Sequence, residues 1–158
     1  MNDRPLVSII INNCNYSCYV GKAIESALNQ TYSHLEVIVV DDGSIDDSRE
    51  VIARYQDRVI PVLKENEGQS SALNVGFTVA KGDIICFLDA DDLALLEKVS
   101  EVVNVFKNNP DIGWCFHSIK VMDMKTGKLL KRICHDNVYV TITEETKQER
   151  SQKCDFRA

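Results

Sequence analysis

The chain has 158 residues, of which 44% are hydrophobic and 27% charged, and its formal net charge is -6 at pH 7. This is the composition of an ordinary globular domain, and its acidity excludes general binding to a nucleic-acid backbone. No stretch approaches the roughly 20 apolar residues that a membrane span needs, and the apolar run at residues 6–11 is too short for a signal peptide. We therefore expect a cytoplasmic protein, at most peripheral to a membrane, with no nucleic-acid partner and no transmembrane segment.

Short apolar runs alternate with helical patterns up to residue 109. Strands are predicted where the runs are rich in β-branched side chains, and apolar pairs four residues apart predict helices between them and after the last strand. The predicted strands are residues 6–11, 36–40, 59–63 and 84–88. Because these strands are apolar on both faces, the order predicts an α/β, Rossmann-like sandwich with a mostly parallel central sheet and helices on both faces.

Some local signals refine this prediction. Pro61 is compatible with its strand only near an edge of the sheet. Ser44 with Asp47 resembles a capping box, and Ser70 and Ser71 are good N-caps for the following helix. The last helix is expected to run through residues 95–106 and to stop before Pro110.

Beyond residue 109 the pattern changes. Residues 113–117, 120–124 and 129–133 are predicted strands, and the last two are joined by a hairpin turn. Trp114 and the neighbouring Cys115 are expected in the core, as is Cys86. The six cysteines form no CxxC pair and are expected to be free thiols. We predict one domain over residues 1–142 and a polar tail over residues 143–158.

The acidic cluster Asp89, Asp91 and Asp92 follows a buried strand. Its carboxylates repel each other by about 1 kcal/mol per close pair in water and by more at a partly buried edge. A hard divalent cation such as Mg²⁺ or Mn²⁺ offsets this repulsion, and it suits a few carboxylates combined with phosphate oxygens. The alternative is a solvated loop whose acids cap the next helix. Because the preceding strand holds the cluster in place, a metal site is favoured.

Further polar groups follow other predicted strands. Asn12 ends the first strand, and Asp42, next to Asp41, ends the second. Asn74 lies on the helix that follows the third strand. Because ligands of parallel sheets bind beyond the carboxyl ends of the strands, these groups and the acidic cluster are expected to lie at one edge. Amides suit a nucleobase edge and a carboxylate accepts hydrogen bonds from a base or a ribose, although turn and cap roles remain open for each segment alone.

Five ordered blocks in this sequence resemble family 2 glycosyltransferases of the GT-A fold, over about residues 5–125. They are VSIIINNCN at 7–15, IESALNQT at 24–31, VVDDGSID at 39–46, NVG at 74–76 and FLDADD at 87–92. The resemblance implies an inverting, metal-dependent transfer of a sugar from a nucleotide-diphosphate sugar, with a UDP-sugar expected, to an unknown acceptor such as a glycan or lipid.

The resemblance also implies roles for single residues. Asn12, Cys14 and Asp42 would face the nucleobase, and Asp89 would contact the ribose. Asp91, with Asp92, would hold Mg²⁺ or Mn²⁺ on the diphosphate. Asn74 would contact the nucleotide or the acidic edge.

Two departures from the family pattern matter. Many relatives have tyrosine where Cys14 stands, and a cysteine stacks less on a base. The family's general base is an acid well beyond the metal motif, and the acids left here are Asp123, Asp136, Glu144 and Glu145, none in an acceptor-side context. We therefore expect the catalytic base to be absent and the domain to be truncated, or naturally short, on the acceptor side.

Other functions stay open at this point. The chain could bind a nucleotide-sugar without turning it over, because its base is missing. It could be a receiver-like, Mg²⁺-binding signalling domain built on Asp41 and Asp89. It could also be a haloacid-dehalogenase-type phosphatase, although the acidic motif of that class normally follows the first strand and here it follows the fourth.

Overall fold

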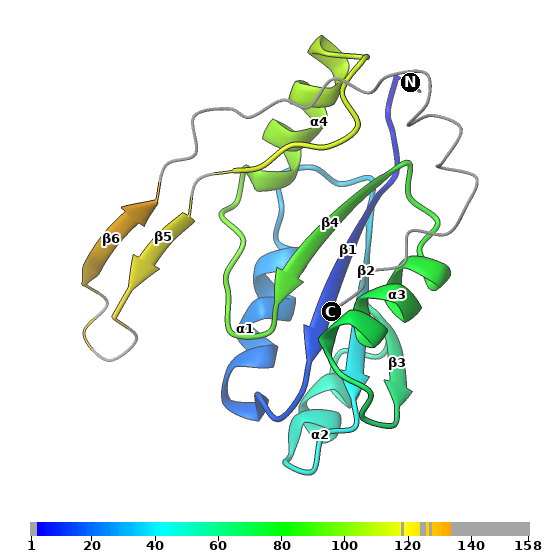
Figure 1. Cartoon of the computed structure of the whole chain (residues 1–158), viewed down its shortest axis with the longest axis vertical. Helices are drawn as coiled ribbons and strands as arrows, with labels where there is room; N and C mark the ends of the chain where they lie inside the picture. Colours follow the sequence, from blue (N-terminus) through cyan, green and yellow to red (C-terminus); the bar gives the residue numbers. More distant parts are fainter. Residues whose placement is uncertain (1–2, 118, 124–125, 127, 134–158) are drawn as a thin grey trace. The chain divides into compact units, whose positions relative to one another are not determined.

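The structure, a computed structural model, describes residues 3–117, 119–123, 126 and 128–133. The chain divides into two units with the boundary between Asn104 and Val105. The first unit holds the sheet that the sequence predicts, and the second holds a hairpin (Figure 1). No helix in the described ranges is long and apolar enough to cross a membrane.

The sheet of the first unit has four parallel strands in the order β3-β2-β1-β4. The strands are β1 (Val7–Asn13), β2 (Leu35–Asp42), β3 (Ile60–Lys64) and β4 (Ile84–Asp89). In this register Asn13 pairs with Asp41 of β2, and Asn12 pairs with Asp89 of β4. The ends of β1, β2 and β4 therefore meet at one edge of the sheet.

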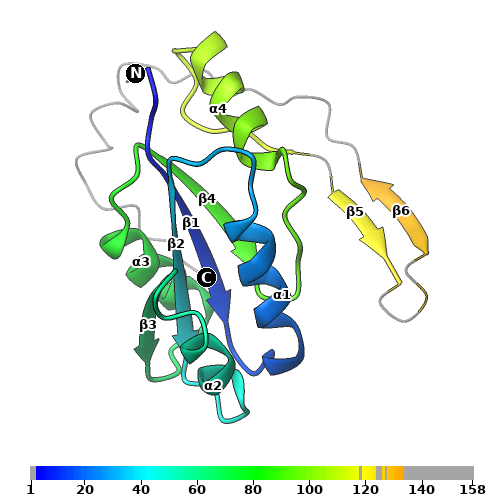
Figure 2. The ribbon, with the colours of Figure 1, turned by 180° about the vertical axis from the view of Figure 1, so that it is seen from behind.

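Helices cover both faces of this sheet. They are α1 (Ser17–Leu28), α2 (Ser48–Ala53) and α3 (Gln69–Val79), whereas α4 (Lys98–Asn108) spans the boundary between the two units. Seen from opposite sides, α3 lies on one face of the sheet and α1 on the other (Figures 1 and 2). The predicted α/β sandwich, a parallel central sheet with helices on both faces, is confirmed.

Alternation of side chains along the strands explains why both faces are apolar. On one face Ile10, Ile38 and Val40 form a buried cluster with Ala72 of α3. The helix can approach closely because Gly76 is also on this side: a Cβ added there would stand 2.5 Å from Cγ2 of Ile10. The other face is covered by α1, whose buried stripe is Val20, Ala23, Ile24 and Ala27.

Helix starts were predicted less well than the strands. Pro61 lies on β3, an edge strand, as predicted. The capping box was wrong, because the Ser44 hydroxyl accepts hydrogen bonds from the Asn15 N–H and the Asn13 amide and does not cap α2. Ser70 and Ser71 are not N-caps, since α3 already begins at Gln69, after Gly68.

The segment before α4 also differs from the prediction. Leu95 and Leu96 lie outside the helix and are 61% and 53% exposed. Their carbonyl oxygens accept hydrogen bonds from Gln30 and Thr31, just after the end of α1. These tertiary hydrogen bonds hold the segment in a non-helical form, and α4 begins only at Lys98.

The second unit contains the predicted hairpin as β5 (Ile119–Met122) and β6 (Leu129–Ile133), which pair antiparallel. The strand predicted at residues 113–117 is absent from the described structure. Trp114 is 54% exposed and its ring lies 5.5 Å from that of Phe116, so the prediction of a core tryptophan was wrong. Cys115 is only half-buried, whereas Cys86 is buried as predicted.

The cysteines at 14, 18, 86 and 115 are free, as expected, and those at 134 and 154 lie outside the described residues. The predicted polar tail at residues 143–158 also lies outside them.

Replacing Gly76 by valine is expected to destabilise the fold by about 2 kcal/mol or more, because added methyl groups must displace packed side chains. The contacts at risk are with Ile10 and Val40 of the sheet. Urea unfolding would measure the loss. The matched control is Thr78→Ala, an exposed position on the same helix, which should change stability by less than about 0.5 kcal/mol. Equal stability of the two variants would contradict this packing argument.

Candidate functional site

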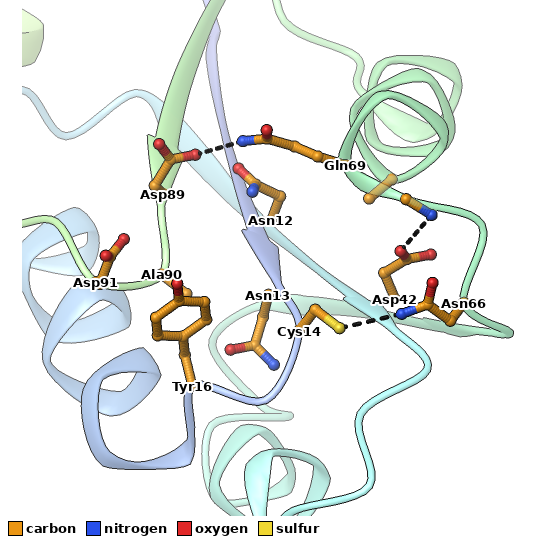
Figure 3. Close-up of a pocket in the computed structure, with 12 residues that line it drawn as sticks. Asn12, Asn13, Cys14, Tyr16, Asp42, Asn66, Gln69, Asp89, Ala90 and Asp91 are labelled. Carbon is orange, nitrogen blue, oxygen red and sulfur yellow. Dashed lines mark hydrogen bonds between the residues drawn. The ribbon is translucent and has the colours of Figure 1, made fainter. Parts of the chain in front are cut away.

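A pocket of about 380 Å³ opens where β1, β2 and β4 end (Figure 3). Its walls come from these strand ends, from the loop that follows β3 and from the start of α3. The lining residues are Asn12, Asn13, Cys14, Tyr16, Asp42, Asn66, Gly68, Gln69, Ala72, Asp89, Ala90 and Asp91. Its size falls in the range of small-molecule sites, roughly 300–1,000 Å³.

The structure brings most of the predicted site residues together. Five of them line the pocket, namely Asn12, Cys14, Asp42, Asp89 and Asp91. Asn74 and Asp92 are not among the lining residues. Asn74 lies within α3, and Asp92 lies beyond the turn that carries Asp91.

Two residues that line the pocket, Asn12 and Asn13, each have a buried amide oxygen without a partner. Oδ1 of Asn12 and Oδ1 of Asn13 are shielded from solvent and accept no hydrogen bond. The Asn13 orientation is fixed, because its Nδ2 donates to Asp41 Oδ2 at 2.8 Å and to Ser44 Oγ at 3.1 Å. A buried acceptor left unpaired costs about 1–3 kcal/mol. A ligand with N–H or O–H donors would remove this cost.

Asp41 has a structural role. It is fully buried, and its carboxylate accepts hydrogen bonds from Asn13, the Ser44 N–H and Arg49 Nε. Burial by itself would raise the pKa of Asp41, but these hydrogen bonds hold it below its ordinary value. Because its oxygens are engaged in this way, Asp41 is a poor phosphoacceptor, which weakens the receiver-like alternative.

Asp42 is buried at the other side of the β2 end. Lys64 Nζ donates to its Oδ1 at 2.6 Å, and the N–H groups of Glu67 and Gly68 donate at 3.1 and 2.8 Å. Burial opposes the charge, yet these donors lower the pKa of Asp42 below its ordinary value. The group is therefore a carboxylate at neutral pH, fixed at the pocket wall.

The loops that follow β1 and β2 each contain a residue with a left-handed backbone conformation. Gly43 has φ +70, and a Cβ built on it would lie 2.5 Å from the backbone nitrogen of Asn66. Asn15, at φ 59, accepts a hydrogen bond from the Ile45 N–H through its side chain. These left-handed positions let the loops after β1, β2 and β3 meet at one place.

Asp89 and Asp91 lie on the opposite side of the pocket from Asp42 and Asn66 (Figure 3). The Asp92 N–H donates to the Asp89 carbonyl at 3.0 Å, which closes a turn and keeps both carboxylates at the strand end. Gln69 Nε2 donates to Asp89 Oδ1 at 3.1 Å. The described residues hold no group of three or more acids, cysteines or histidines arranged for a metal. A pair of carboxylates completed by ligand phosphates is the arrangement that Mg²⁺ commonly uses.

A cation also stands near this acidic turn. Lys98 Nζ donates to the Phe87 carbonyl at 3.3 Å. Burial lowers the pKa of Lys98, and the nearby Cys86, Asp92 and Asp89 oppose that shift. Lys98 thus balances part of the acidic charge from the strand side.

Tyr16, Asn66 and Gln69 line the pocket and were missed by the sequence reasoning as ligand-facing residues. Asn66 lies in the loop before α3, and Gln69 is the first residue of that helix, a stretch for which only the N-caps Ser70 and Ser71 were predicted. Tyr16 follows the first strand end closely and is 42% exposed. The signal available in the sequence was an aromatic residue close to the polar end of the first strand.

The fold and the pocket together define a class: an α/β protein with a ligand site at the carboxyl edge of a parallel sheet, formed by acids and amides. The family model for glycosyl transferase family 2 matches residues 8–156. The chain belongs to this family.

Curated relatives agree with this assignment. An uncharacterized glycosyltransferase of Nostoc is 41% identical over 121 residues, covering 74% of this chain and 37% of that protein. The Escherichia coli enzyme UDP-Glc:alpha-D-GlcNAc-diphosphoundecaprenol beta-1,3-glucosyltransferase WfaP is 40% identical over 101 residues, covering 63% of this chain and 40% of its own. The chain thus spans less than half the length of these relatives.

Solved structures share the fold. A mannosyltransferase of Pyrobaculum calidifontis, in complex with GDP-Man and Mn²⁺, matches with a TM-score of 0.62 and 24% identity over 79% of this chain and 38% of that one. Staphylococcus aureus TarS, in complex with UDP, matches with a TM-score of 0.58 and 24% identity over 67% of this chain and 33% of that one.

Replacing Asp41 by asparagine should lower the free energy of unfolding at pH 7 by about 2 kcal/mol, because the buried donors of Asn13 and Ser44, and Arg49 Nε, lose a charged acceptor. The folded pKa of Asp41 lies below the unfolded one. Its stabilisation is therefore full above the unfolded pKa, about 3.9, and is lost as the pH falls through the folded pKa. The difference in unfolding free energy between Asp41→Asn and wild type should therefore shrink below about pH 4.

Denaturant unfolding at several pH values would measure this gap. Asp47→Asn, at an exposed position that makes no side-chain cap, is the matched control and should show little change. A gap that stays constant down to pH 2, or one as small as that of the control, would contradict the assigned role of Asp41.

Proposed function

We propose that the pocket binds the nucleotide-diphosphate part of a sugar donor together with Mg²⁺ or Mn²⁺, and that the protein transfers the sugar with inversion to an acceptor. The observation that carries this proposal is the combination in one pocket of unpaired buried acceptors at Asn12 and Asn13 with the carboxylates of Asp89 and Asp91. Hydrogen-bond donors of a nucleoside match the first pair, and a cation with its phosphates matches the second.

In this proposal the two sides of the pocket bind different parts of the donor. Asn12, Cys14 and Asp42 face the base, and Asp89 accepts a hydrogen bond from the ribose. Asp91 ligates the metal ion. Asp92 does not line the pocket, but it directly follows Asp91 in the turn closed by its N–H and the Asp89 carbonyl, and it is the proposed second ligand. Asn74 receives no role, because it does not line the pocket.

A divalent ion held by Asp91 would act as a Lewis acid that stabilises the charge of the departing diphosphate. The residues of this chain bind and orient the donor. Gln69 holds the Asp89 carboxylate through its 3.1 Å hydrogen bond. The buried amides of Asn12 and Asn13 fix the nucleoside, so the leaving group keeps one position while the sugar is exposed to the acceptor.

The acids that line the pocket are Asp42, Asp89 and Asp91, and each already has a role in donor binding. In the described part of the chain the pocket therefore offers no separate general base. The relatives are more than twice as long as the stretch they share with this chain. We propose that the base which deprotonates the acceptor is supplied outside the described residues.

A uridine donor is the favoured choice. WfaP, a relative at 40% identity, is named for its UDP-Glc donor. Uracil carries one ring N–H, from which Asp42 can accept a hydrogen bond, and a small base suits a pocket of about 380 Å³. The sugar and the acceptor are left open in this proposal.

Titration calorimetry with UDP tests the metal role. Wild-type protein should bind UDP in Mn²⁺ and at least tenfold more weakly in EDTA, and Asp91→Asn should lose most of the Mn²⁺ effect, because a carboxylate ligand is removed. Glu101→Gln, an exposed acid on α4, is the control and should bind like wild type. UDP binding that is independent of metal, or absent, would refute the proposed site.

Tyr16→Ala should weaken UDP binding about tenfold, because Cys14 offers no aromatic face and Tyr16 is the aromatic residue lining the described pocket. Base stacking on an aromatic ring is worth about 1–3 kcal/mol. Tyr16→Phe should retain affinity. Tyr19→Ala is the control, because it removes a neighbouring aromatic ring, whose centroid lies 6.2 Å from that of Tyr16, that does not line the pocket. Equal affinities for Tyr16→Ala and wild type would exclude stacking at this position.

A further inference from the structure

Lys64 lies behind the pocket wall and its ammonium group is held by three oxygens. Nζ donates to Asp42 Oδ1 at 2.6 Å and to the Glu65 carbonyl at 2.6 Å, and it lies 3.1 Å from Glu67 Oε2. The Lys64 side chain is only 13% exposed. Lys64 is the last residue of β3, and the sheet register pairs it with Asp42. The lysine is thus fixed at a defined place, unlike a surface lysine.

Asp42 is the only residue of this ion pair that lines the described pocket. Three donors already occupy its carboxylate: Lys64 Nζ and the N–H of Glu67 on Oδ1, and the N–H of Gly68 on Oδ2. An ionised carboxylate has about four lone-pair sites, so roughly one remains, and with no proton the group can only accept.

We infer that Lys64 is a positioning residue for the base end of the site: it keeps Asp42 an ionised, fixed acceptor, which selects bases with a ring N–H over bases with an unprotonated ring nitrogen. This inference rests on the proposed function. Uracil, thymine and guanine belong to the first group, and cytosine and adenine to the second. A ring nitrogen lone pair facing the carboxylate would leave two acceptors in contact, which costs binding energy.

Removal of the lysine charge should reduce the preference for bases with a ring N–H. Asp42 is only 2% exposed, and burial favours the neutral acid. Without Lys64 the carboxyl group would take up a proton at a higher pH than in wild type. A protonated carboxyl group can donate to the ring nitrogen of cytosine, so the discrimination between uracil and cytosine would fall.

Other charged groups near Asp42 do not replace this lysine. Glu67 is acidic and shares Lys64 with it. Arg49 donates to Asp41 through Nε and to the Lys64 carbonyl through Nη2. The loop after β3 also has supports of its own, since Ser71 Oγ donates to Glu67 Oε2 at 2.8 Å. A change at Lys64 therefore acts on the charge state of Asp42 more than on the course of the loop.

The test is calorimetry with UDP and CDP in Mn²⁺ between pH 5 and 8, on wild type, Lys64→Met, Lys64→Gln and Lys64→Arg. Wild type should prefer UDP throughout. Lys64→Met should bind UDP about tenfold more weakly at pH 7, lose most of the UDP-over-CDP preference, and weaken further as the pH falls. Lys64→Arg should keep the preference for UDP over CDP and the wild-type dependence of UDP binding on pH. The control is Lys22→Met, at an exposed lysine on α1, which should match wild type.

Lys64→Gln keeps a hydrogen-bond donor without the charge. It replaces Lys64→Met in the binding test if the methionine variant unfolds. It should show the same shift in pH profile. A separate measurement, the carboxyl chemical shift of Asp42 followed by NMR without nucleotide, should titrate at higher pH in both neutral variants.

The outcomes separate the two proposals. Failure of the wild type to bind UDP would refute the proposed function. Normal UDP binding by wild type, with an unchanged base preference, pH profile and Asp42 titration in Lys64→Met and Lys64→Gln, would overturn the role of Lys64 alone.

Discussion

Parallel strands all end on the same side, so the order of the strands decides which loops become neighbours. Here β1 lies between β2 and β4, and its register sets Asn13 opposite Asp41 and Asn12 opposite Asp89. These pairings bring residues from widely separated parts of the chain to one sheet edge. Because helices cover both faces of the sheet, the strand ends are the place where polar groups can gather.

The sheet and much of the site could be predicted from the sequence because the signals are local. Uninterrupted apolar runs gave the four strands, and their polar ends gave Asn12, Asp42, Asp89 and Asp91. The errors arose where tertiary contacts overrode local preference. Ser44 has the chemistry of a helix cap but binds the turn after β1, and Leu95 follows a helical period but its carbonyl is held by Gln30. No periodicity argument could have shown either partner.

The two adjacent aspartates at the end of β2 also show what could not be predicted from the sequence. Successive side chains of a strand point to opposite faces, so Asp41 and Asp42 enter different surroundings. Asp41 is enclosed by Asn13, Ser44 and Arg49, while Asp42 reaches the pocket and is held by Lys64. The sequence shows two equivalent acids, and only the spatial arrangement separates a structural carboxylate from a ligand-facing one.

The backbone contact at Gly43 has a kinetic consequence. The turn after β2 lies so close to Asn66 that no side chain would fit between them, and the neighbouring N–H groups of Glu67 and Gly68 are bonded to Asp42. This wall of the pocket is therefore assembled before any ligand arrives. Preorganisation of this kind reduces the ordering cost of association. A nucleoside should meet a preformed surface on its base side, and association there should proceed in one step, without a slow loop closure.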